Sequence, residues 1–211
     1  MQRRLFLGIA ATSVTAFPHL AGAQSQPVEG KDYVAVSPRH PTQDRNRVEI
    51  LEFFAYGCSH CDEFEPALRA WTRKLPPDVV FRRIPVAFRD SMVAHQQIYF
   101  AIEALGLIEP LHHKVFDAIH RERQRLDRPE DIGAFVARHG VDRTRFLEAM
   151  NSFGMPIRLR QAAALVKGYK VEGTPSLGVD GRWLTSGAMA GSHARSLVVT
   201  EHLAGLARKA R

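Results

Sequence analysis

A four-residue motif, Cys58-Ser59-His60-Cys61, contains both cysteines of this 211-residue chain. The residues just before it, 48–54, are mostly apolar and rich in strand-forming side chains, which predicts a buried strand. From Cys58 onward, apolar side chains recur at intervals of three and four residues as far as Leu75, which predicts a helix. The motif is therefore expected at the start of a helix that follows a buried strand after a short turn.

A cysteine at a helix start is predicted to be acidic. The unpaired backbone N–H groups and the helix dipole favour negative charge there, so we expect the pKa of Cys58 to fall below its ordinary value of about 8.5. Cys61 lies one turn further along the same face, close enough to form a disulfide with Cys58. His60 adds positive charge beside the thiolate if it is protonated; the alternative is a surface residue without a role. Because a stabilised thiolate favours the reduced form, the disulfide is predicted to be oxidising.

Two structural interpretations of the cysteine pair are disfavoured. A chain of this length, 45% hydrophobic, can bury a full core without cross-links, and a disulfide across four residues restricts the unfolded chain very little. Zinc needs four ligands, but the chain has no second cysteine pair. His112, His113 and His120 fit an amphipathic helix better than a metal site. Redox chemistry is the remaining interpretation.

Glu52 is an acid inside the predicted buried strand, six residues before Cys58. A buried carboxylate at this place could accept or relay the proton of Cys61 during disulfide exchange, and a raised pKa would be its sign. A glutamate at a solvated strand edge is the alternative. The residues alone do not separate the two.

The first 23 residues have the layout of a secretory signal peptide. Arg3 and Arg4 precede an apolar stretch, 5–17, and small residues, 21–23, follow it. The apolar stretch is shorter than the roughly 20 residues that span a bilayer. We therefore expect an exported protein in a compartment where disulfides persist, with an uncleaved membrane-surface helix as the alternative. The paired arginines also resemble the twin-arginine export pattern, and the route stays open.

The charge of the chain does not indicate nucleic acid binding. The formal net charge is +7, and removal of Arg3 and Arg4 with the signal segment would leave +5. Lys and Arg are interspersed with acids along helix-like stretches, as in the stretch that holds Arg121, Glu122 and Arg123. Such patterns are typical of solvated helix faces.

Three short segments together resemble the DsbA family of periplasmic disulfide oxidases. They are Glu52-Phe53-Phe54, Cys58-Ser59-His60-Cys61 and Gly173-Thr174-Pro175, and the similarity extends in outline over residues 30–210. The resemblance implies an α/β, thioredoxin-like fold with an inserted all-helical domain.

Local patterns agree with that fold. Strands are predicted at 48–54 and 79–88, a hairpin at 176–185 and a final helix at 193–209, with only helical signals from 92 to 168. The expected division after the signal peptide is a thioredoxin-like domain, 24–91 and 169–211, around a helical domain, 92–168. Residues 24–44 are expected to be an extended lead-in.

The resemblance also implies functional residues. Cys58 would be the exposed nucleophile that forms a mixed disulfide and Cys61 the partner that resolves it. Pro175 would be a cis-proline facing the dithiol, Thr174 would offer backbone hydrogen bonds to a bound peptide, and Glu52 would be the buried acid. No cofactor is expected beyond the redox-active disulfide.

The implied partners are reduced, newly exported polypeptides and a quinone-linked membrane reoxidant of the DsbB type. One departure affects the chemistry: the family commonly has proline after the first cysteine, where this chain has Ser59. That dipeptide tunes the potential, so the oxidising strength is left open. Two other functions also stay open: a disulfide isomerase or reductase, and a peptide-binding or chaperone module with an incidental cysteine pair.

Overall fold

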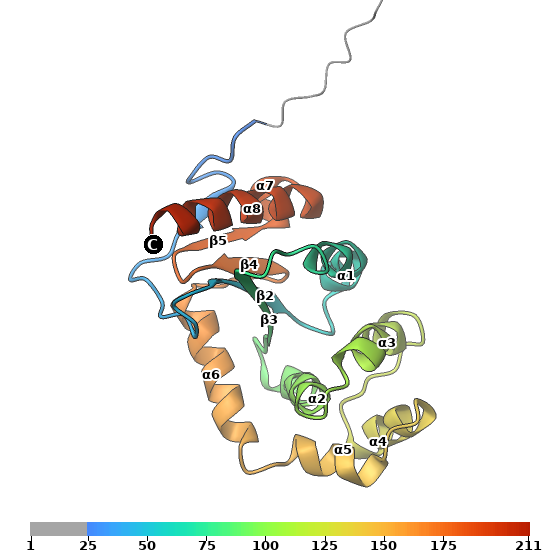
Figure 1. Ribbon diagram of the computed structural model, residues 1–211. Helices are drawn as coiled ribbons and strands as arrows, with labels where there is room; N and C mark the ends of the chain where they lie inside the picture. The colour runs from blue at the N-terminus through green and yellow to red at the C-terminus, as the bar shows by residue number, and fades with distance from the viewer. Residues whose placement is uncertain (1–24) are drawn as a thin grey trace, which may run out of the picture.

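A mixed sheet of five strands forms the centre of the protein, in the order β1-β5-β4-β2-β3 (Figure 1). The computed structural model describes residues 25–211, and the predicted signal segment lies outside them. Strands β2 and β3 are parallel, and the other neighbours are antiparallel. The strands are β1 (Tyr33–Ala35), β2 (Val48–Phe54), β3 (Val79–Pro85), β4 (Ser176–Val179) and β5 (Trp183–Ser186).

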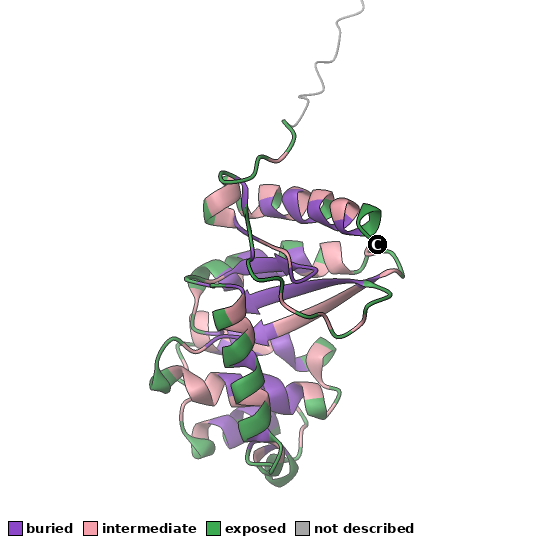
Figure 2. Ribbon diagram, turned by 90° about the vertical axis from the view of Figure 1, so that its left-hand side faces the viewer, coloured by how far each residue is buried: buried purple, intermediate pink, exposed green. Residues whose placement is uncertain are grey.

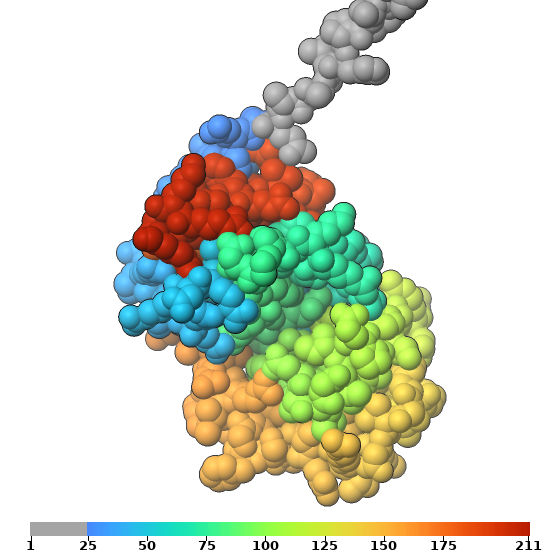
Figure 3. All heavy atoms as spheres, in the orientation of Figure 1, coloured from blue at the N-terminus to red at the C-terminus, as the bar shows by residue number. Residues whose placement is uncertain are grey.

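Helices cover the sheet and extend beyond it. Helix α8 packs on β2, β4 and β5 and also contacts α1. Helices α2 to α6 come between β3 and β4 in the chain and form the lower part of the molecule in Figures 1 and 3. The helices are α1 (Ser59–Thr72), the 3-10 turn η1 (Asp90–Met92), α2 (Val93–Ala104), α3 (Ile108–His120), α4 (Pro129–Arg138), α5 (Arg143–Met150), α6 (Met155–Gly168), α7 (Gly187–Ala190) and α8 (His193–Lys209).

The predicted fold class is confirmed, with two local corrections. The strand predicted at 79–88 ends at Pro85. Val86 makes the last hydrogen bond to β2, at Phe54, and the chain then leaves the sheet towards η1. The lead-in predicted at 24–44 contains β1, which pairs with β5. The division of the chain at 92–168 into a separate helical domain stays a prediction, although α2 to α6 fall within that stretch.

Strand β2 is buried along its whole length, including its two glutamates. Its neighbours on both sides are strands, so both of its edges are paired, and its side chains are buried on both faces. Val48 and Ile50 belong to the core beneath α8, whereas Leu51 and Phe53 belong to the larger core shared with the helical segment. Figure 2 shows this concentration of buried residues in the strands. Any charge carried by β2 must therefore be satisfied by protein groups.

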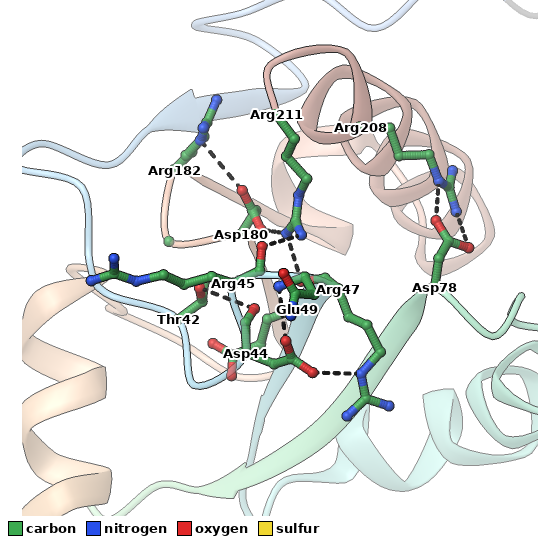
Figure 4. A network of polar contacts seen from close by, with 12 residues as sticks. Thr42, Asp44, Arg45, Arg47, Glu49, Asp78, Asp180, Arg182, Arg208 and Arg211 are labelled. Carbon is green, nitrogen blue, oxygen red and sulfur yellow. Dashed lines mark hydrogen bonds and ion pairs between the residues drawn. The ribbon is translucent and has the colours of Figure 1, made fainter.

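A network of ion pairs fastens the end of the sheet where β2 begins (Figure 4). Asp180, fully buried in the turn between β4 and β5, accepts from Arg211 at 2.6 Å and from Arg39 at 3.0 Å, with Arg182 at 3.4 Å. The next residue, Gly181, has φ +69°, and a Cβ there would overlap the carbonyl oxygen of His40. This end joins the lead-in, the β4–β5 turn and the end of α8.

Among residues 25–211, no helix is both long and apolar enough to cross a membrane.

Candidate active site

The two cysteines lie where β2 gives way to α1. Cys58 is the residue that caps α1, with extended backbone angles (φ −93°, ψ 116°), and is half-buried. Its carbonyl accepts from the N–H groups of Cys61 and Asp62, which starts the helix. Cys61 is buried one turn further on, with 1% of its surface exposed. Both are free thiols, so the structure describes the reduced form.

The loop before β4 meets the cysteines from the other side. Because β2 and β4 run antiparallel, with Phe53 beside Ser176, the end of β2 and the start of β4 lie at the same edge of the sheet. The Thr174–Pro175 peptide bond at this edge is cis. The Cys58 sulfur lies 3.3 Å from the Thr174 carbonyl oxygen, to which the protonated thiol can donate a hydrogen bond. The fold thus brings together segments more than a hundred residues apart in the chain.

The two thiols differ strongly in acidity. A hydrogen bond from the Cys61 thiol is the largest effect that lowers the pKa of Cys58, to about 5; the Thr174 side chain and the backbone N–H groups of Cys61 and His60 lower it further, against partial burial. Burial is the main cause that raises the pKa of Cys61, and the Cys58 sulfur adds to it. At neutral pH, Cys58 is a thiolate and Cys61 keeps its proton.

Glu52 is buried in a central strand, which excludes the solvated strand edge. Its carboxyl group is 1% exposed, and burial raises its pKa to about 8 despite the opposing charge of Arg83. Arg83 is its neighbour in the parallel register of β2 and β3. The Arg83 Nε lies 3.0 Å from Glu52 Oε2, but neither atom has a partner in hydrogen-bond geometry. Glu52 is also one of the charges that raise the pKa of Cys61.

Three further residues form a chain of ion-pair contacts with Glu52, which the sequence did not predict. Arg83 also donates to both carboxylate oxygens of Glu65 on α1, at 2.9 and 3.1 Å. The Nε2 of His112 on α3 lies 3.5 Å from Glu65, and its Nδ1 lies 2.8 Å from the Tyr56 hydroxyl. Glu65, four residues after Cys61, was a readable signal, because that spacing places both on one face of α1.

His60 is exposed and lines a groove beside the cis-proline. The backbone N–H of His60 is one of the groups that lower the pKa of Cys58, and the predicted influence of a protonated imidazole stays a prediction. The groove encloses about 600 Å³ and has a mostly apolar lining. Its lining includes Thr174, Pro175, Leu184, Met189 and His193.

Two of the α3 histidines lie close to polar groups of the protein. His112 is buried against Glu65 and Tyr56, and His120 Nε2 lies 2.7 Å from the Tyr56 carbonyl. Within residues 25–211, no group of three or more His, Cys, Asp or Glu side chains is placed to hold a metal ion.

Thiols of such unequal acidity are suited to disulfide exchange, because one is a thiolate at neutral pH and the other is held as a thiol. In a thioredoxin fold, this pair defines the class of thiol:disulfide oxidoreductases. Within that class, the chain belongs to the family described as the DSBA-like thioredoxin domain, which matches residues 49–196.

Similar proteins carry the same class of activity in their names. The chain is 39% identical over 189 residues to the thiol:disulfide interchange protein DsbA of Burkholderia cepacia, covering 89% of this chain and 86% of that protein. It is 35% identical over 195 residues to DsbA of Pseudomonas aeruginosa strain PAO1, covering 91% and 92%. The crystal structure of Pseudomonas aeruginosa DsbA superposes with a TM-score of 0.85 at 35% identity, covering 87% of this chain and 96% of that chain.

Proposed function

We propose that this protein donates a Cys58–Cys61 disulfide to newly exported polypeptides through a mixed disulfide. The observation that carries the proposal is the difference in acidity between the two thiols. Cys58 is stabilised as a thiolate only when the pair is reduced, so reduction of the disulfide is favoured and the oxidised protein is a strong oxidant.

The proposed exchange begins with the oxidised protein. A substrate thiolate attacks the Cys58 sulfur, the Cys58–Cys61 bond breaks, and the electron pair leaves on Cys61, which takes up a proton. A second substrate thiolate then attacks the substrate sulfur of the mixed disulfide. It releases Cys58 as a thiolate and leaves the substrate with a new disulfide. The two electrons lost by the substrate are held by the Cys58–Cys61 dithiol.

The high pKa of Cys61 refines the expectation that Cys61 resolves the mixed disulfide. Attack by Cys61 would return the substrate in its reduced form, because it re-forms the Cys58–Cys61 bond. A buried thiol that keeps its proton is a poor nucleophile. Its protonation therefore favours release by the second substrate thiolate, which completes oxidation.

The groove beside Pro175 is proposed to hold the polypeptide around the reacting cysteine. Its apolar lining, about 600 Å³ of space and position against Thr174 suit an extended peptide segment. Backbone groups of Thr174 would pair with that segment, and Glu52 would supply the proton that Cys61 takes up. His60 lines the same groove, so we assign it to substrate contact.

The proposed setting is the periplasm, reached through a cleaved segment 1–23, by the general or the twin-arginine route. Reoxidation requires a partner that accepts two electrons from the dithiol, for which a quinone-linked membrane protein of the DsbB type is proposed. The names of the relatives support an interchange protein over a chaperone module.

Oxidative refolding of a reduced secretory protein tests this function. The wild type should accelerate it, and Cys58→Ala should abolish the acceleration. Cys61→Ala should retain capture of oxidised substrates as a stable mixed disulfide. A Cys58–Cys61 potential near that of thioredoxin, about −270 mV, would instead indicate a reductase. Activity that survives Cys58→Ser would indicate a peptide-binding module.

A further inference from the structure

A buried chain of ionisable groups runs from Glu52, whose charge acts on Cys61, to the helical segment. It consists of Glu52 on β2, Arg83 on β3, Glu65 on α1 and His112 on α3, whose side chains are at most 10% exposed. Consecutive members lie 3.0, 2.9 and 3.5 Å apart. Four elements of the fold thus each contribute one titratable side chain to a single cluster, defined here as the four-residue cluster.

Burial restricts the net charge of this cluster, because an uncompensated charge in a protein interior costs several kcal/mol. Arg83 carries one positive charge, and the two carboxylates together would carry two negative charges. One additional proton makes the cluster neutral. Two acceptors are available for it: Glu52, which makes no hydrogen bond to Arg83, and His112.

Glu65 is not a comparable acceptor. Although burial acts to raise its pKa, His112 and Arg83 hold it below its ordinary value. Burial lowers the pKa of His112, so the proton rests on Glu52 in the reduced protein. Tyr56 and Tyr99 also face the cluster, but burial raises their pKa values and keeps them neutral. His113, Arg69 and Glu109 are further ionisable groups beside His112.

Two of the three unpartnered atoms of the cluster belong to the two proton sites, Glu52 and His112. Glu52 Oε2, Arg83 Nε and His112 Nε2 are buried and lack a hydrogen-bond partner. On the opposite side of its ring, His112 Nδ1 lies 2.8 Å from the Tyr56 hydroxyl. That hydroxyl can donate to a neutral imidazole or accept from a protonated one. His112 is therefore held in place in either state.

A small recess connects the cluster with the surface on the side of α1 and α3. It encloses about 20 Å³, enough for a single water. Its lining includes Glu65, Arg83, His112 and the exposed Glu109. Protons can reach His112 by this path without passing the substrate groove, which lies beside Pro175.

We propose that His112 is the second site of the proton carried by the four-residue cluster and positions that proton for the dithiol. The inference rests on the proposed function. When the disulfide is opened, Glu52 gives its proton to the Cys61 thiolate and becomes ionised. His112 then takes up one proton from solvent. This proton balances the one that the substrate thiol released when it ionised. The cluster is neutral again, and the proton count of the reaction is balanced. The proton then returns from His112 to Glu52, where it rests in the reduced protein.

The test measures the rate at which a small dithiol, dithiothreitol, reduces the Cys58–Cys61 disulfide as a function of pH. His112→Gln keeps the size and polarity of the side chain but cannot take a proton. It should slow reduction about tenfold near pH 6, the scale of a coupling within one polar network. The difference should vanish near pH 9, where Glu52 is ionised in both proteins. His202→Gln, a histidine on α8 outside the cluster and the recess, is the control and should follow the wild-type profile.

A double-mutant cycle separates this role from simple packing. With Glu52→Gln as background, His112→Gln should have no further effect on the rate, because no proton is then exchanged between the two sites. An equal slowing at every pH, or a slowing that persists in the Glu52→Gln background, would overturn the proposal.

A measurement on the unaltered protein covers the case in which His112→Gln does not fold. Nitrogen NMR of the His112 ring should show it protonated to a greater extent just after the disulfide is opened at low pH than in the resting protein. An imidazole that is neutral throughout contradicts the inference. If instead Cys58→Ala retains oxidative refolding activity, the proposed function fails and the result is separate from the role of His112.

Discussion

The two ends of the central sheet differ in how many arginines pair with their buried carboxylates. Where β2 begins, the fully buried Asp180 is surrounded by Arg39, Arg182 and Arg211. Where β2 ends, Glu52 and Glu65 share the single guanidinium of Arg83. One end has more cations than buried acids, and the other has more acids than cations.

The ratio of arginines to buried carboxylates distinguishes a structural ion-pair network from a group that can transfer a proton. Three guanidinium groups around one carboxylate neutralise it and hold the lead-in, the β4–β5 turn and the end of α8 together. Two carboxylates around one guanidinium leave a negative charge that a proton must cancel. That proton can affect disulfide exchange, because the charge of Glu52 raises the pKa of Cys61. The same type of ion pair therefore serves structure at one end and proton transfer at the other.

The largest expected effect comes from Asp180→Asn. Loss of the carboxylate leaves Arg211 and its neighbours in a poorly solvated place without their counter-charge, which costs about 3–5 kcal/mol of the free energy of unfolding. Urea denaturation measures the loss, while the rate of disulfide reduction should be unchanged. Arg39→Gln is the control, since that side chain is 49% exposed and its removal should cost about 1 kcal/mol or less. A loss below that of Arg39→Gln would show that the network does not fasten this end.

Glu52→Gln, the equivalent change at the other end, should act in the opposite direction. The pKa of Glu52 is raised from 4.5 to about 8, so between these values the folded state holds a proton that the unfolded state has released. The contribution of Glu52 to stability is therefore complete below pH 4.5 and is lost as the pH rises towards 8.

Glutamine does not ionise, so it removes this decline. Near pH 8 the variant should exceed the wild type by about 4 kcal/mol in the free energy of unfolding, and near pH 4 the two should be equal. Denaturation at a series of pH values measures the difference. A gap between the two proteins that does not vary with pH would contradict the assignment of the proton to Glu52.

The sequence predicted the local part of the active site but not the partners of its charges. A strand, a turn and a helix start are consecutive in the chain, so the position of Cys58 at the cap of α1 followed from local pattern. The hairpin after Pro175 and the final helix were predicted in the same way.

Contacts between segments that are distant in the chain could not be predicted from local sequence patterns. The pairing of Glu52 with Arg83 depends on the register of β2 and β3, and the place of His112 depends on how α3 packs beside α1. Hydrophobic periodicity shows which face of α3 is buried, but not which of its histidines meets an acid. For that reason the sequence places His112 only on an amphipathic helix and does not decide between the two interpretations of Glu52.

The smallest of these effects belongs to Cys58, whose charge is stabilised by contacts of the half-exposed sulfur. Its pKa is lowered from 9.0 to about 5, so the folded thiol loses its proton at a lower pH than the unfolded one. The stability that this adds to the reduced protein is complete above pH 9 and is lost as the pH falls through about 5. After allowance for solvent screening, the contribution at neutral pH is about 1–2 kcal/mol.

The oxidised protein has no thiolate, so only the reduced form should show this dependence. The measurement is the difference in the free energy of unfolding between reduced and oxidised protein, from pH 5 to pH 9. It should move in favour of the reduced form as the pH rises. Reduced Cys58→Ser should lack the slope, because serine does not ionise in this range. A slope of the same size in that variant would assign the dependence to the four-residue cluster. The charge of Cys58 would then not be stabilised separately from the proton of that cluster.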